Sequence, residues 1–169
     1  MGKASRKMKK KQQQVVRKQG KAKLEALVAR MQEQEEQEDY AGAIDTMAEI
    51  IGVGQPPVER VYAAAYDYFM LADYERAAKW VDITLTLAPG HIEARLLLGR
   101  ICIIEDRQED AFDIYEDILT RNKQGLSAEM QREFYDVMAY YGEEEADLLQ
   151  GSYPQIDAFL KEYAAAEKN

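Results

Sequence analysis

Residues that could support catalysis are few and far apart in this chain. The single histidine, His91, follows a Pro-Gly pair with no serine or cysteine beside it, and we expect it to be an exposed loop residue. The single cysteine, Cys102, falls at an apolar position of a helical pattern, where we expect a small buried side chain. One cysteine excludes an internal disulfide, and one histidine excludes a two-histidine metal site. We therefore predict no catalytic residues.

Patterns that could bind phosphate or metal ions are incomplete. Gly52-Val53-Gly54 is too short for a phosphate-binding loop and follows a helical pattern rather than a strand. The acidic runs at 35–39 and 143–145 lack the spacing of a calcium-binding loop. We expect them to be solvated helix surfaces, with Glu143 at a helix N-terminus after Gly142. We predict that the protein is not an enzyme and has no cofactor and no metal site.

Charge is divided sharply along the chain. Residues 1–23 hold ten of the 22 basic residues and no acidic residue, whereas all 31 carboxylates lie from Glu25 onward. The other 12 basic residues leave this acidic body with a formal charge of −19, although the whole chain carries only −9. The basic arm should attract phosphate and anionic surfaces, and the body should repel them.

Three roles stay open for the basic arm. It could be a solubilising segment, it could bind RNA, ribosomes or anionic lipid, or it could fold onto the acidic body. No aromatic residue lies among its cations, so stacking on nucleic-acid bases is not expected. If the arm binds RNA or a ribosome, the binding residues are Lys7, Lys9, Lys10, Lys11, Arg17 and Lys18.

The composition also bears on location. No apolar run is long enough to cross a membrane, and no apolar stretch follows the basic residues as it would in a secretory signal. A lone thiol suits a reducing compartment. We therefore expect a cytoplasmic protein without a transmembrane segment.

The body contains a repeat with a period of 34 residues. Residues 39–51, 73–85 and 107–119 align at this offset, each with a small residue followed by large residues four and eight positions later. The aligned positions are Ala43, Ala77 and Ala111; Met47, Val81 and Tyr115; and Ile51, Leu85 and Leu119. This spacing places each set on one face of a helix. A second helical pattern precedes each stretch, and the tight turns between the two are expected near 72–73 and 106–107.

A 34-residue helix–turn–helix unit of this kind resembles the tetratricopeptide repeat (TPR) family. The resemblance rests on Tyr68, Ala77 and Pro89 in the second unit and on Gly99 and Ala111 in the third. It implies an all-α TPR helix–turn–helix solenoid of about three repeats with a C-terminal helical cap. The predicted boundaries are 1–23 for the basic arm, 24–57, 58–91 and 92–125 for the repeats, and 126–169 for the cap. Such units stack because one unit cannot bury its own apolar face.

The predicted cap does not repeat cleanly. Ser127 is the expected N-cap of a helix that ends at Gly142, and a short helix is expected over 143–150. A last helix should begin after Pro154 and bury the stripe Ile156, Phe159, Leu160 and Tyr163.

The resemblance also implies a binding surface, because the first helices of stacked units in this family line a concave groove. The residues expected on the groove face are Glu59, Tyr62, Tyr66, Phe69, Met70, Leu96, Arg100 and Ile103. The basic clamp with which some members hold a partner's C-terminal carboxylate is absent, since Glu25, Glu59 and Glu93 stand at places of the clamp. We predict a protein–protein interaction module, an adaptor or co-chaperone-like protein, that binds a protein or peptide segment in an apolar groove.

Alternatives to partner binding remain open. The chain's own C-terminal helix could occupy the groove, or two copies could associate as a homodimer. A function of another class is an RNA- or ribosome-associated protein that binds through residues 3–23 of the basic arm.

Overall fold

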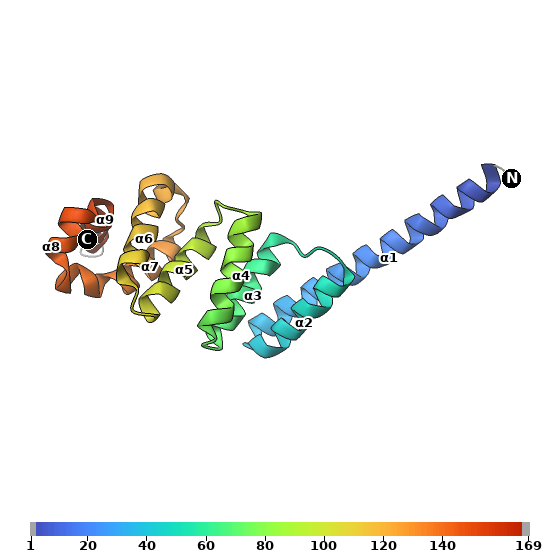
Figure 1. Cartoon of the computed structure of the whole chain (residues 1–169), viewed down its shortest axis with the longest axis horizontal. Helices are drawn as coiled ribbons and strands as arrows, with labels where there is room; N and C mark the ends of the chain where they lie inside the picture. The colour runs from blue at the N-terminus through green and yellow to red at the C-terminus, as the bar shows by residue number, and fades with distance from the viewer. Residues whose placement is uncertain (1–2, 167–169) are drawn as a thin grey trace. The chain divides into compact units, whose positions relative to one another are not determined.

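The computed structural model describes residues 3–166, with side chains from residue 12 onward, and this part of the chain consists of helices joined by short turns and loops, without strands (Figure 1). The elements are α1 (Lys3–Glu36), α2 (Tyr40–Val53), α3 (Val58–Met70), α4 (Tyr74–Leu87), α5 (Ile92–Ile104), α6 (Gln108–Asn122), the 3-10 helix η1 (Lys123–Gly125), α7 (Ala128–Glu144), α8 (Ala146–Ser152) and α9 (Pro154–Ala166). The expected all-α class is confirmed. Within the described range, none of these helices combines the length and apolar character needed to cross a membrane.

The chain divides into two compact units, and the boundary falls inside α4. Unit 1 is Met1–Trp80 and unit 2 is Val81–Asn169. Each unit has a hydrophobic core of its own.

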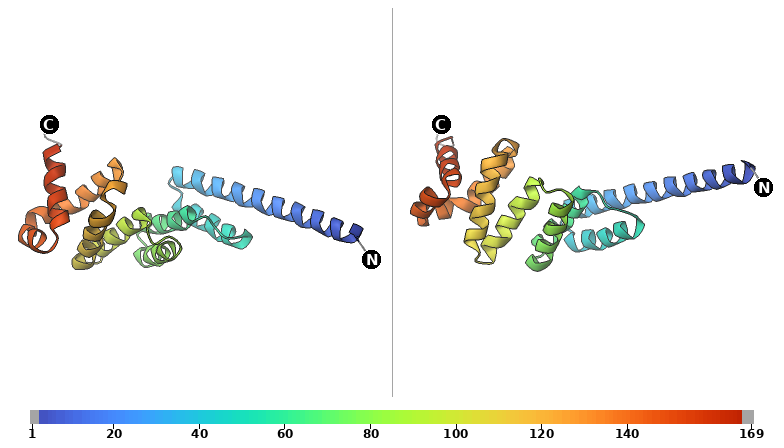
Figure 2. Two further views of the ribbon diagram at one scale, coloured as in Figure 1. Left: turned by 90° about the horizontal axis from the view of Figure 1, so that it is seen from above. Right: turned by 45° about the horizontal axis from the view of Figure 1, so that its top comes forward.

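Unit 1 is built on the pair α1 and α2, and α3 packs on α2. Its core is formed by apolar side chains that recur at helical spacing on the facing surfaces. These residues are Leu27 and Met31 from α1, Ala43, Met47 and Ile50 from α2, and Val61, Ala63 and Ala64 from α3. Figure 2 shows that α2 lies beside only the C-terminal part of α1. The side chains of residues 12–19 are exposed, so this part of the basic arm does not pack on the acidic body.

The same turn ends three helices at a spacing of 34 residues. Glu38, Ala72 and Asp106 all adopt a left-handed backbone conformation, with φ of 59°, 59° and 56°. The next backbone N–H in each case donates to a carbonyl five positions back: Asp39 to Gln34 at 2.8 Å, Asp73 to Tyr68 at 2.9 Å, and Arg107 to Cys102 at 2.8 Å. This bond satisfies a carbonyl that the helix end would otherwise leave unpaired. The turns predicted near 72–73 and 106–107 are confirmed.

Unit 2 contains the close pair α5 and α6. Gly99 allows the close approach, because a Cβ atom at this position would lie 2.3 Å from the ring of Tyr115. The Tyr115 ring meets Phe134 edge-on at 5.0 Å, and Phe134 meets Phe159 in the same way at 4.8 Å. These contacts bring α6, α7 and α9 into one core.

The C-terminal part of unit 2 is helical as predicted, but two helix ends differ. The expected stop at Gly142 is wrong, because α7 continues to Glu144 and α8 starts only at Ala146. Glu143 therefore lies in the last turn of α7 and not at a helix N-terminus. Gly142 has a packing role instead, since a Cβ there would lie 2.8 Å from Cδ1 of Leu160 in α9.

The N-terminus of α9 is held by a side chain from another helix. The Glu116 carboxylate of α6 accepts hydrogen bonds from the backbone N–H groups of Gln155 at 2.9 Å and Ile156 at 3.0 Å. A carboxylate in this place satisfies free N–H groups and complements the helix dipole. Glu116 thereby fixes α9 against α6.

Candidate functional site

Three of the groove residues predicted on α3 line an open cleft within unit 1. The cleft has a volume of about 360 Å³ and is formed by α1, α2 and α3. Its lining residues are Glu35, Tyr40, Glu59, Arg60, Tyr62, Ala63, Tyr66 and Asp67. Of these, Glu59, Tyr62 and Tyr66 were among the predicted groove residues. We call this surface the α1–α3 cleft.

The local fold of α3 explains which side chains face the cleft. Pro57 is the N-cap of α3, and its backbone is extended, with φ of −59° and ψ of 146°, so the helix begins at Val58. Val61, Ala64 and Ala65 are fully buried on one side of α3. Tyr62 and Tyr66, one position further along, therefore lie on a different side and remain half-buried.

An ion pair joins α1 to α3 at the cleft. Nη1 of Arg60 donates to both carboxylate oxygens of Glu35, at 3.0 Å to Oε1 and 2.8 Å to Oε2. The two side chains are only 15% and 22% exposed. The positive charge of Arg60 is therefore bound closely to Glu35.

Asp67 is the most unusual residue of the cleft. Its relative exposure is 0%, and neither carboxylate oxygen has a hydrogen-bond partner. Burial, and secondarily the nearby Glu35 charge, raise the pKa of Asp67 from 3.8 to about 7, although Arg60 acts in the opposite direction. A buried carboxylate without a partner costs stability, which makes Asp67 a candidate functional residue.

The pKa of the Tyr40 hydroxyl is also raised in this cleft. Burial raises its pKa, and the charge of Glu38 and the neighbouring Tyr66 and Asp67 raise it further. Tyr40 consequently keeps its proton and remains a hydrogen-bond donor at neutral pH.

The two remaining predicted groove residues of unit 1 do not line the cleft. Phe69 is only 9% exposed, and its ring lies 6.4 Å from that of Tyr66 and 5.5 Å from that of Tyr74. Phe69 thus packs behind Tyr66 in the interior of unit 1. Met70, at the end of α3, is 43% exposed.

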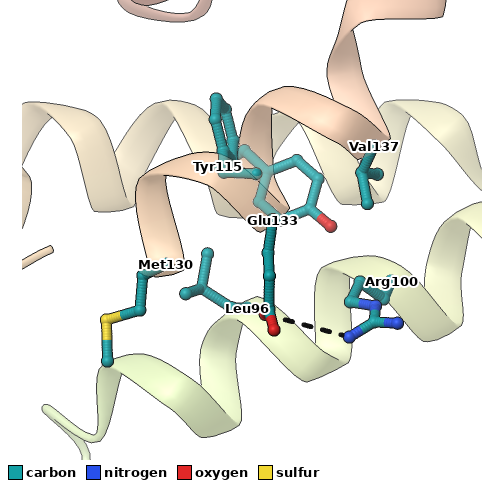
Figure 3. A pocket seen from close by; sticks show the side chains of 7 residues that line it. Leu96, Arg100, Tyr115, Met130, Glu133 and Val137 are labelled. Carbon is teal, nitrogen blue, oxygen red and sulfur yellow. Dashed lines mark ion pairs between the residues drawn. The ribbon is translucent and has the colours of Figure 1, made fainter. Parts of the chain in front are cut away.

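The predicted groove residues of unit 2 are partly covered by the chain itself. Figure 3 shows Met130 and Glu133 of α7 beside Leu96 and Arg100 of α5, and the cavity left between them measures only about 10 Å³. Leu96 is 8% exposed, and Glu133 lies 4.0 Å from the Arg100 guanidinium. Ile103 packs against the core of unit 2. Helix α7 thus packs on this surface. The sequence left open that the chain's own C-terminal helix could occupy the groove, but the helix found here is α7 and not the last helix, α9.

A second hollow, of about 630 Å³, lies in unit 2 between α6, α7 and α8. It is lined by Gln108, Glu109, Phe112, Tyr140, Tyr141, Glu144, Glu145 and Leu148. Its three carboxylates, Glu109, Glu144 and Glu145, are exposed to solvent. Water already solvates these charges, so a ligand would relieve no burial cost there.

The residues predicted for RNA or ribosome binding are described only in part. Arg17 and Lys18 are exposed on α1. The side chains of Lys7, Lys9, Lys10 and Lys11 lie outside the described residues. Binding of RNA or a ribosome by the arm stays a prediction.

His91 and Cys102 have structural roles. His91 is half-buried, contrary to the exposed position expected, and its Nδ1 accepts a hydrogen bond from the N–H of Ala94 as the N-cap of α5. Cys102 is 1% exposed as expected, and burial raises the pKa of its thiol. Across the part of the chain that the structure describes, no group of three histidine, cysteine, aspartate or glutamate side chains is arranged to hold a metal ion.

Glu35 belongs to the groove face predicted for the first unit, whereas Tyr40, Arg60, Ala63 and Asp67 were not predicted to line the groove. A signal for Asp67 exists in the sequence, because it is an isolated charge three positions after Ala64 on the apolar side of α3. The Glu35–Arg60 pair spans 25 positions, so helical spacing alone could not reveal it.

Comparison with known proteins gave no relative. The chain matches no protein-family model, and no curated protein or solved structure shows significant similarity to it. Function therefore has to follow from the chemistry of the cleft.

Proposed function

We propose that the chain is a protein-interaction module that binds a segment of a partner protein in the α1–α3 cleft. The observation that carries this proposal is the buried Asp67 carboxylate, which lacks a hydrogen-bond partner in a cleft that tyrosines line. Half-buried tyrosines offer large apolar contact area together with a hydroxyl group, a combination common at interfaces. Such a module would act as an adaptor or co-chaperone-like protein.

The finer architecture belongs to the same proposal. We infer a TPR-type solenoid of about three repeats, supported by the left-handed turn that recurs every 34 residues at Glu38, Ala72 and Asp106. Close contact between small and large residues, as at Gly99 and Tyr115, is also typical of stacked helix pairs.

Tyr66→Asp is expected to abolish binding of a partner segment at the cleft. The substitution removes an aromatic contact and places a second carboxylate beside Asp67. Loss of a central aromatic anchor costs about 2 kcal/mol or more, which corresponds to roughly a 30-fold loss of affinity. The measurement is selection of peptides from a random display library on the full chain, followed by titration of the selected peptides against wild type and variant.

Two controls make the result decisive. Circular dichroism should show unchanged helicity in Tyr66→Asp, and Tyr66→Ala serves as a second variant without the added charge. Tyr140→Asp changes a tyrosine of the unit 2 hollow and should leave affinity unchanged. If Tyr140→Asp alone abolished binding, the α1–α3 cleft would not be the binding site.

A further inference from the structure

The α1–α3 cleft contains a buried carboxyl group that no hydrogen-bond donor satisfies. Both oxygens of Asp67 are buried without a hydrogen-bond donor, although native proteins pair nearly all such groups. An apolar ligand would leave this carboxylate unpaired, and an anionic ligand would add repulsion. The electrostatics of the cleft thus favour a ligand that brings positive charge and hydrogen-bond donors.

The described residues that line the cleft supply little of that charge. The titratable groups that face Asp67 are Glu35 from α1, Tyr40 from α2, and Arg60 and Tyr66 from α3. Only Arg60 is positive, and its hydrogen bonds go to Glu35.

Aromatic rings complete a cation-binding arrangement. Tyr40, Tyr62 and Tyr66 line the same cleft as the carboxylates. The face of a tyrosine ring carries negative electrostatic potential and attracts guanidinium and ammonium groups, most strongly where water is excluded. A volume of about 360 Å³ is at the small end of ligand pockets, which suits one long side chain of a peptide.

We infer that the cleft binds an arginine or lysine side chain of the partner segment, between the tyrosines and with its positive charge compensating Asp67. This inference rests on the proposed function, because it names the residue type that the partner must present. Both Asp67 oxygens are covered in the free chain, so a direct hydrogen bond to the cation requires a neighbouring side chain to turn aside.

Protonation of Asp67 provides a specific readout. With a pKa of about 7, the carboxyl is about half protonated at neutral pH in the free chain. A cation favours the ionised form, so binding must lower the pKa of Asp67 and release a proton. A purely structural Asp67 would not respond in this way.

The test is a titration of the full chain by nuclear magnetic resonance, in which the Asp67 carboxyl carbon is followed against pH. The probes are the blocked tripeptide acetyl-Ala-Arg-Ala-amide and its neutral counterpart with citrulline in place of arginine. The arginine probe at saturation is expected to lower the pKa by about one unit, which means about tenfold tighter binding to the ionised form. The citrulline probe is expected to leave the pKa unchanged.

Variants separate this site from the general acidity of the body. Asp67→Asn should weaken the affinity for the arginine probe about tenfold, as expected for loss of a close charge partner. The affinity is measured from the chemical-shift changes that the probe causes at Tyr62 and Tyr66. Asp45→Asn removes an exposed carboxylate of α2 and should leave both shifts and affinity unchanged. Equal effects of the two variants, or equal pKa changes with arginine and citrulline, would overturn the inference.

The outcomes also distinguish this inference from the proposed function. Library peptides could lose binding to Tyr66→Asp but still bind Asp67→Asn. That result would support peptide binding at the cleft and overturn the inference that the cleft binds an arginine or lysine side chain. Failure of every library peptide to depend on Tyr66 would overturn the proposed function itself. A fall in the pKa of Asp67 with increasing concentration of the chain alone would identify the basic arm of a second copy, and not a separate partner, as the occupant.

Discussion

Asp67→Asn is expected to raise the free energy of unfolding at about pH 8 by on the order of 2–4 kcal/mol. The pKa of Asp67 is about 7 in the folded chain and 3.8 as an ordinary aspartate. The folded chain therefore holds this proton more tightly than the unfolded chain, and wild-type stability falls as pH rises from about 4 to about 7. Asparagine cannot ionise, so the variant lacks this loss.

The difference between wild type and variant should disappear at about pH 4, where Asp67 is protonated in the folded chain and partly protonated in the unfolded chain. Urea unfolding at both pH values checks this, with fluorescence of Trp80, which packs against the unit 1 core, as the signal. Asp45→Asn is the matched control and should change the unfolding free energy by less than about 0.5 kcal/mol at either pH. If Asp67→Asn raised the free energy of unfolding equally at both pH values, the result would contradict a raised pKa of Asp67 in the folded chain.

Tyr115→Ala is expected to destabilise unit 2 by about 3–5 kcal/mol, the usual cost of truncating a large buried aromatic side chain. The ring is 1% exposed, contacts Phe134 edge-on, and fills the space that Gly99 leaves between α5 and α6. Its removal leaves a cavity that these helices can close only in part. Hydrogen exchange of the α6 and α9 amides measures the loss.

Tyr140→Ala is the control for that experiment, since Tyr140 is 64% exposed. Its effect on exchange should correspond to less than about 0.5 kcal/mol. Comparable losses from the two tyrosine variants would contradict the placement of Tyr115 at the centre of the unit 2 core.

Helix pattern and turn position could be predicted because both depend on local sequence. The small residues Ala43, Ala77 and Ala111 mark the second helix of each repeat, and the turns lie where the 34-residue spacing puts them. Gly142 shows the limit of such reasoning. Glycine near a helix end usually signals a stop, but here the approach of Leu160 from α9 requires a small residue inside the helix.

The binding site could be predicted only where one helix face defines it. Tyr62 and Tyr66 followed from the spacing on α3, whereas Tyr40 of α2 joins the cleft through packing between helices. The cover that α7 places over Leu96 and Arg100 is likewise a contact between distant segments, which periodicity does not encode. Asp67 was not predicted, because helical spacing places it beside an apolar stripe but does not show that its carboxyl group is buried.

The most direct test of partner binding at the α1–α3 cleft is nuclear magnetic resonance of the full chain with labelled tyrosine rings, titrated with a library-selected peptide. Binding at the cleft predicts shifts of Tyr40, Tyr62 and Tyr66 that saturate together with the affinity measured by titration. Shifts confined to Tyr140 and Tyr141 in unit 2, with the three cleft tyrosines unchanged, would contradict it.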